Sequence, residues 1–101
     1  MASKRRYVTE GYEHRPGQPW LLVMVDWEDA ATQSAWTGHD EIMETHRCKL
    51  VGFLRSRLAD GLVVVANFSE DSQMSGQFRV PAGMVAEVEV IKEVKDLYEE
   101  E

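Results

Sequence analysis

The densest group of chemically active side chains lies between positions 26 and 46. No lysine or arginine interrupts the stretch from Asp26 to Glu44, whose six carboxylates are Asp26, Glu28, Asp29, Asp40, Glu41 and Glu44. Paired carboxylates act as general acid and base when their surroundings separate their pKa values. Because the first three acids stand at or beyond the end of an apolar run, we expect a solvated acidic loop here rather than a catalytic pair.

Histidine and cysteine side chains follow the same acids, at a spacing that argues against a metal site. His39, His46 and Cys48 are separated by seven and then two positions, which matches no usual zinc pattern. On a helix, His39 and His46 would lie about 10 Å apart along the axis, too far for one ion. The run from Asp26 to Asp29 also lacks the glycine turn and final glutamate of a calcium loop. We therefore predict no metal, no cofactor and no catalytic residues.

Two tryptophans give this stretch the character of a binding surface. Trp27 and Trp36 flank the acids, and aromatic faces beside carboxylates recognise cationic or ring-shaped ligands. The alternative is that both indoles pack the segment onto the rest of the fold. We predict a site for a ligand or protein partner that is formed by Asp26, Trp27, Asp29, Trp36 and His39.

The length and net charge of the chain limit the classes of protein to which it can belong. A chain of 101 residues is enough for one domain. Its net charge of −7 repels phosphate backbones, so direct nucleic-acid binding is disfavoured despite a basic cluster at Lys4–Arg6. Cys48, the only cysteine, excludes an internal disulfide and suits a reducing compartment. Without an apolar run of about 18 residues or a signal peptide, a soluble cytoplasmic protein with no membrane partner is expected.

Upstream of the acids, one strand is expected to carry the site. Residues 1–19, which contain two prolines, are predicted to be a flexible tail. The apolar run Trp20–Trp27 is typical of a central strand, or of an edge strand that pairs with another copy. Thr37-Gly-His-Asp40 matches a capping box, which predicts a short helix over 39–46, inserted after the first strand.

From Cys48 onward the hydrophobic pattern has a period of two, which is typical of strands. Asp60-Gly61 predicts a hairpin turn, because glycine tolerates the positive φ of tight turns. Further strands are expected over 62–68, 77–80 and 84–91. The charged segment Lys92–Glu101 is predicted to be an acidic tail or a frayed helix.

Five short strands favour a mainly β fold. We predict a small five-stranded SH3-like or Sm-like barrel over residues 20–91, because barrel closure removes exposed strand edges. Gly52 is the expected position of the bend that closure needs. An α+β open antiparallel sheet packed by one helix is the alternative.

Three segments of the chain resemble those of a group of short accessory proteins of tailed phages and prophages. They are Val25-Asp-Trp-Glu-Asp-Ala30, Val51-Gly-Phe-Leu54 and Val80-Pro-Ala-Gly-Met-Val85. Together they span about residues 20–91 in order, and the tails lie outside them. The resemblance implies a phage-encoded protein that acts on a host system. It brings no activity and no catalytic residues, because none is established for the group.

These observations favour a non-catalytic binding module that engages a host protein or sequesters a small ligand, with action against host defence as one role. A self-assembling structural protein is an alternative, with the strand Trp20–Val25 pairing between copies. A small metal-dependent hydrolase that uses the acids and His39 is a further alternative.

Overall fold

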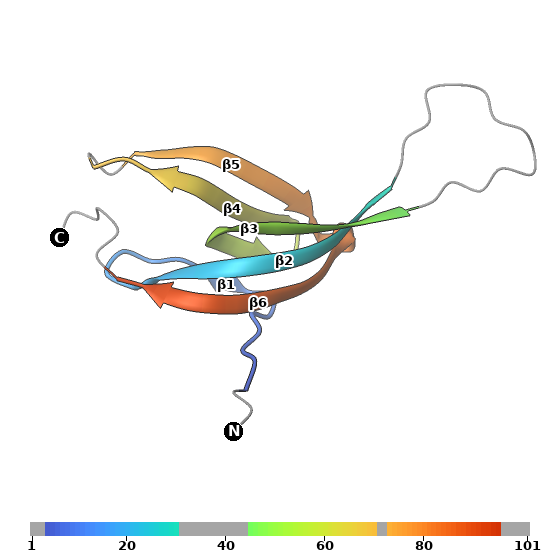
Figure 1. Cartoon of the computed structure of the whole chain (residues 1–101), viewed down its shortest axis with the longest axis horizontal. Helices are drawn as coiled ribbons and strands as arrows, with labels where there is room; N and C mark the ends of the chain where they lie inside the picture. Colours follow the sequence, from blue (N-terminus) through green and yellow to red (C-terminus); the bar gives the residue numbers. More distant parts are fainter. Residues whose placement is uncertain (1–3, 31–44, 71–72, 96–101) are drawn as a thin grey trace, which may run out of the picture.

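The computed structural model describes residues 4–30, 45–70 and 73–95. These residues form a six-stranded antiparallel sheet with one turn of 3-10 helix (Figure 1). In chain order the elements are β1 (Tyr12–Glu13), β2 (Trp20–Ala30), β3 (Thr45–Leu58), β4 (Gly61–Phe68), β5 (Met74–Pro81), η1 (Ala82–Met84) and β6 (Val85–Val94). The predicted mainly β class is confirmed.

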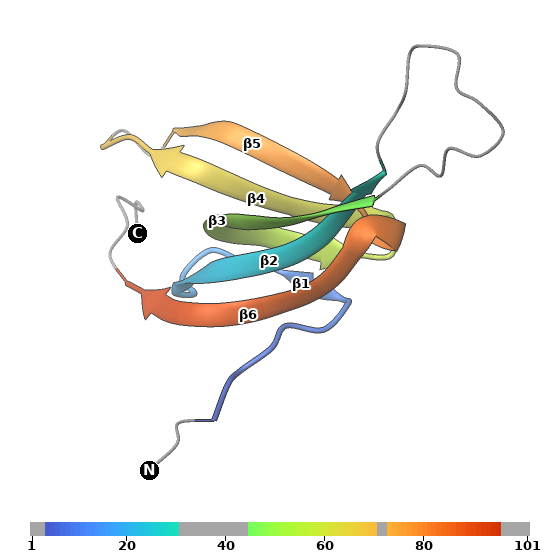
Figure 2. The same ribbon diagram turned by 45° about the vertical axis from the view of Figure 1, so that its right-hand side comes forward.

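The sheet is open, with the strand order β5-β4-β3-β2-β6 and β1 beside β3. In both views β4 and β5 diverge from β2 and β6, and β5 does not pair with β6 (Figures 1 and 2). The prediction of a closed barrel is therefore wrong, and the open antiparallel sheet matches better. One reason is that the outer edge of β6 is occupied. The Val8 N–H donates to the Val88 carbonyl at 2.9 Å, and the Val90 N–H donates to the Arg6 carbonyl at 2.8 Å.

The chain before β2 differs from the predicted tail. Val8 is buried, Tyr7 forms a β-bridge with Glu89, and β1 pairs with the end of β3. At the other end, β6 continues to Val94, beyond the predicted limit of residue 91. The ordered sheet therefore draws on residues that the sequence pattern assigned to the tails.

No α-helix occurs in residues 4–30, 45–70 or 73–95. Of the helix predicted over 39–46, positions 39–44 lie outside the described residues, whereas Thr45 and His46 begin β3. The predicted end of the helix is therefore wrong. The physical reason is strand pairing, since β3 lies antiparallel to β2 from Ala30 opposite Thr45 onward.

β3 is the long central strand, and it connects the two halves of the sheet. Its first part pairs with β2 up to Phe53, and its last part pairs with β4 from Phe53 onward. Gly52 allows close approach of β4, because a Cβ there would lie 3.2 Å from the Val65 carbonyl oxygen. The register irregularity that bends β3 lies farther on, between Leu54 and Ser56. The Asp60-Gly61 hairpin is confirmed, as Leu58 pairs with Gly61.

The hydrophobic core lies on one face of this sheet. Alternate residues of each strand point into it, as the pleat requires. Fully burying a valine or leucine side chain contributes about 1.5–3 kcal/mol, so this face accounts for most of the packing. Its buried members are Val8, Leu21, Val23, Val25, Leu54, Leu62, Val64, Val80 and Val88.

Candidate functional site

The ends of β2 and β3 project beyond the rest of the sheet as a two-stranded ribbon (Figures 1 and 2). The ladder between β2 and β6 ends where Trp27 meets Val85, while the ladder between β2 and β3 continues to Ala30 and Thr45. Of the acids that the sequence analysis assigned to a solvated loop, Glu28 and Asp29 lie in this part of β2 and Asp26 lies just before it, so the loop interpretation is wrong for these three. The other three lie outside the described residues.

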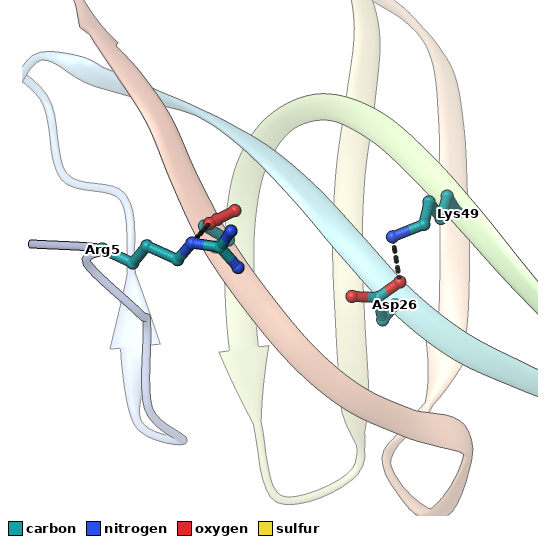
Figure 3. A network of polar contacts seen from close by, with 4 residues as sticks. Arg5, Asp26 and Lys49 are labelled. Atoms are coloured by element: carbon teal, nitrogen blue, oxygen red, sulfur yellow. Dashed lines mark ion pairs between the residues drawn. The ribbon is translucent and has the colours of Figure 1, made fainter. Parts of the chain in front are cut away.

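Asp26, just before the ribbon, and the two acids of the ribbon each lie opposite a basic side chain of β3. The register pairs are Asp26 with Lys49, Glu28 with Arg47 and Asp29 with His46. The Lys49 Nζ lies 2.9 Å from the Asp26 Oδ1 (Figure 3). Opposite charges across neighbouring strands stabilise a sheet by about 0.2–1 kcal/mol per pair. Asp26, which also lies opposite Glu87 of β6, is therefore compensated by a residue of the neighbouring strand β3, and this ion pair helps to hold β2 against β3.

Trp27 lies at the base of the ribbon, half-buried against the core. Its ring centroid is 5.6 Å from that of Phe78 in β5, with the planes tilted by 56°. This geometry is typical of a favourable aromatic contact. The indole Nε1 is buried and has no hydrogen-bond partner in the described part of the chain. A buried donor without an acceptor costs about 1–3 kcal/mol, so the placement of this indole lowers the stability of the fold.

The predicted site is only partly assembled in the described residues. Trp27 packs against the core, whereas the side chain of Asp26 is held by Lys49 on the neighbouring strand. Asp29 is exposed on the ribbon, and strand alternation places it on the same face as Trp27 and opposite to Asp26. The remaining two members, Trp36 and His39, lie outside the described residues.

Phe78 is the aromatic residue that sequence reasoning missed at this site. It is 41% exposed, although its register partner Val64 is buried in the core. No local pattern distinguishes Phe78 from any other strand residue, because its contact with Trp27 joins strands that are not neighbours in the sheet. Only the curvature of the sheet brings β2 and β5 together here.

Among the described residues, the other reactive groups near the ribbon do not form a metal centre. Cys48 lies opposite Trp27 in the register, half-buried, with its Sγ 3.7 Å from the His46 carbonyl oxygen. Within residues 4–30, 45–70 and 73–95, no three His, Cys, Asp or Glu side chains are grouped so as to hold a metal ion.

The side chains with shifted pKa values lie in the N-terminal segment, away from Trp27. A hydrogen bond with the Tyr7 side chain, together with the Glu89 carboxylate, raises the pKa of the Arg5 guanidinium. The Arg5 Nε lies 3.5 Å from the Glu89 Oε1, so the segment is tied to β6 by charge as well as by backbone hydrogen bonds (Figure 3). Burial raises the pKa of the Tyr12 phenol.

No known family, curated protein or solved structure matches this chain. No helix in the described ranges is long and apolar enough to span a bilayer. What the protein does must therefore be inferred from the side chains that the sheet brings together.

Proposed function

We propose that this protein is a non-catalytic binding module that engages a protein partner through the Trp27–Phe78 pair. The observation that carries the proposal is the contact of the half-buried Trp27 with Phe78, an aromatic ring that is 41% exposed. A partner that covers Phe78 would bury apolar surface next to the Trp27 ring. Aromatic anchors of this kind dominate binding energy at protein interfaces.

The surroundings of the pair support binding rather than catalysis. Met74, 36% exposed, belongs to the same strand as Phe78 and, by alternation, to the same face, which extends the apolar surface along β5. Asp26, one of the two acids adjacent to Trp27 in the chain, is engaged by Lys49. A carboxylate held in an ion pair on a sheet is suited to fixing the strand register. A carboxylate that acts as a general base would instead need to face a substrate.

We further propose that the protein is a phage-encoded accessory protein that acts in the host cytoplasm on a host protein. The resemblance of three segments to phage accessory proteins supports this origin. The first and third of these segments meet in the sheet, since Trp27 pairs with Val85. Residues of two of the three segments therefore meet at Trp27, one of the two residues of the proposed surface.

The experiment compares tagged wild-type protein with F78S and V51S after chemical crosslinking in a bacterial host, using quantitative mass spectrometry. Val51 is the matched control, because it is a 54% exposed apolar residue on the face away from the core. We expect one host protein to be recovered with wild type and V51S, and about tenfold less with F78S. Equal recovery by all three folded proteins, or recovery by none, would overturn the proposal.

Self-assembly is a second candidate function. The strand that favours it is β5, and not the predicted strand Trp20–Val25. β2 is paired by β6 from Trp20 onward and by β3 from Leu22 onward, so Leu22–Val25 has no edge to offer a second copy. Within the described residues β5 pairs only with β4, and a free strand edge is a template for pairing. Light scattering tests this candidate, and a monomer at high protein concentration would exclude it.

A further inference from the structure

A second concave surface lies on the other face of β5, formed by four strands and the segment after β1. It is an open pocket of about 410 Å³, and the polar side chains lining it are Glu13, His14, Arg55, Ser56, Gln77 and Arg79. Phe78 points to the core side of β5, so alternation places Gln77 and Arg79 on the opposite side. This pocket is therefore separate from the proposed Trp27–Phe78 surface.

The strand register explains why these side chains meet. Ser56 lies opposite Glu13 on one side and, through β4, in line with Arg79 on the other, since Val63 pairs with both Ser56 and Arg79. Residues so aligned on paired strands share one face of the sheet. The pocket is thus built on rigid strands, which hold side chains more firmly than loops do.

Arg55 enters the pocket from a β-bulge. The β3–β4 register passes directly from Leu54 to Ser56, which leaves Arg55 as the extra residue. Bulges of this kind re-aim a side chain and are frequent beside functional sites. The His14 N–H donates to the Arg55 carbonyl at 2.9 Å, so the bulge also fixes the segment that carries His14.

His14 is oriented by an aromatic stack. Its ring lies 3.5 Å from that of Trp20 at an interplanar angle of 16°, and Trp20 is buried and in contact with Phe68. A side chain held in this way loses little conformational freedom when a ligand binds, which favours affinity. The aromatic cluster therefore supports one wall of the pocket.

The charge of the pocket is opposite to that of the chain. The whole protein carries −7, yet the pocket holds two arginines and one acid, Glu13. Arg5, Arg6 and Lys49 are paired with carboxylates. By contrast, neither Arg55 nor Arg79 has an ion pair within the described ranges. Two exposed guanidinium groups that form no ion pair among the described residues, held on one rigid face, are suited to bind an anion.

We propose that this pocket binds a small molecule through a phosphate group held by Arg55 and Arg79. Guanidinium forks match phosphate oxygens in a bidentate manner. With two arginines, the Ser56 hydroxyl and the Gln77 amide, the pocket offers more donors than the two oxygens of a carboxylate can use. Its volume lies in the range of small-molecule sites. A nucleic-acid strand is disfavoured as the ligand, because the acidic remainder of the surface would repel its other phosphates.

The test is a titration of the ¹⁵N-labelled full-length protein, followed by amide chemical shifts at constant ionic strength. The probes are inorganic phosphate, adenosine 5′-monophosphate and succinate. We expect saturable shifts with both phosphate compounds, centred on β3 and β5 around Arg55 and Arg79. R55Q and R79Q should each weaken binding about tenfold, while R47Q, which removes an equal charge from the distant ribbon, should leave it unchanged.

A further variant and a second readout distinguish the possible outcomes of this titration. R79K should recover only part of the affinity, because lysine keeps the charge but lacks the planar fork. The dispersion of each variant's spectrum reports directly whether it is folded. Equal weakening by R47Q and R79Q, or shifts spread over the whole sheet, would overturn the site. Succinate binding as tightly as the nucleotide would overturn the assignment to phosphate. None of these outcomes depends on Phe78, so the proposed protein partner is tested independently.

Discussion

Arg57 of β3 donates a hydrogen bond from its Nη1 to the backbone carbonyl of Val8, a residue 49 positions earlier. Its own carbonyl accepts a hydrogen bond from the Gly11 N–H at 2.6 Å. The same residue therefore holds the N-terminal segment through its side chain and through its backbone. This attachment explains why the segment runs along the sheet and covers the outer edge of β6.

Replacing Arg57 with alanine should destabilise the fold. The guanidinium bond to the Val8 carbonyl is partly buried, and hydrogen bonds that involve a charged group contribute about 1.5–3 kcal/mol. Urea unfolding monitored by tryptophan fluorescence measures the loss. The control is R47A on the exposed ribbon, for which we expect less than about 1 kcal/mol. Equal losses for the two variants would mean that Arg57 does not anchor the segment.

Replacing Val8 with alanine should cost about 2 kcal/mol of the free energy of unfolding, from two buried methyl groups at about 0.8 kcal/mol each and the cavity they leave. Val8 is only 7% exposed and belongs to the core. The neighbouring exposed Thr9 provides the control, and T9A should change stability by less than about 0.5 kcal/mol. A neutral V8A would show that the segment is a tail after all.

Gly52 and Gly83 should respond in opposite directions to alanine. At Gly52 a Cβ would lie 3.2 Å from the Val65 carbonyl oxygen and 3.4 Å from the Val64 Cβ, so β3 and β4 must move apart. We expect a loss of about 1–3 kcal/mol. At Gly83 nothing lies within 4 Å, and G83A should be neutral or gain up to about 1 kcal/mol by restricting the unfolded chain. Thermal unfolding of both variants checks this, and a stable G52A would refute the close approach.

The Asp26–Lys49 pair should show measurable coupling in a double-mutant cycle of D26N and K49M. We expect about 0.2–1 kcal/mol at low salt. The coupling should shrink as salt is added, because the Lys49 side chain is 64% exposed and screening acts on exposed charges. If the free-energy changes of the two single substitutions simply add, the pair does not contribute to the strand register.

Alkaline unfolding should depend on Tyr12. Burial raises the pKa of its phenol in the folded state, Glu93 adds to this, and Arg6 opposes it. The folded protein therefore keeps this proton to a higher pH than the unfolded chain does. The resulting stability is fully present below a pH of about 10, the ordinary value for tyrosine, and is lost as the pH rises through the folded-state pKa. The free energy of unfolding of Y12F should fall less steeply above that pH than that of wild type, and parallel curves would contradict the prediction.

Local sequence patterns were enough to predict the strands that lie between Cys48 and Ile91. Period-two alternation and the Asp60-Gly61 turn depend only on neighbouring residues, because the pleat and the hairpin are local geometries. The same kind of local pattern gave a wrong prediction where strand pairing joins residues that are distant in the chain. The capping-box pattern predicted a helix that extended to His46, yet His46 pairs with Asp29 in a ladder, and tertiary pairing overrides local preference.

The amino-acid sequence by itself determined that this protein is mainly β, acidic and built on a hairpin-connected series of strands. Tertiary structure alone decided that the sheet stays open, that Asp26 of β2 meets Lys49 of β3, that Trp27 meets Phe78, and that Arg55 and Arg79 share a pocket. These relationships join residues that are distant in the chain. They arise from register, bulges and curvature, which are properties of paired strands and not of any one segment.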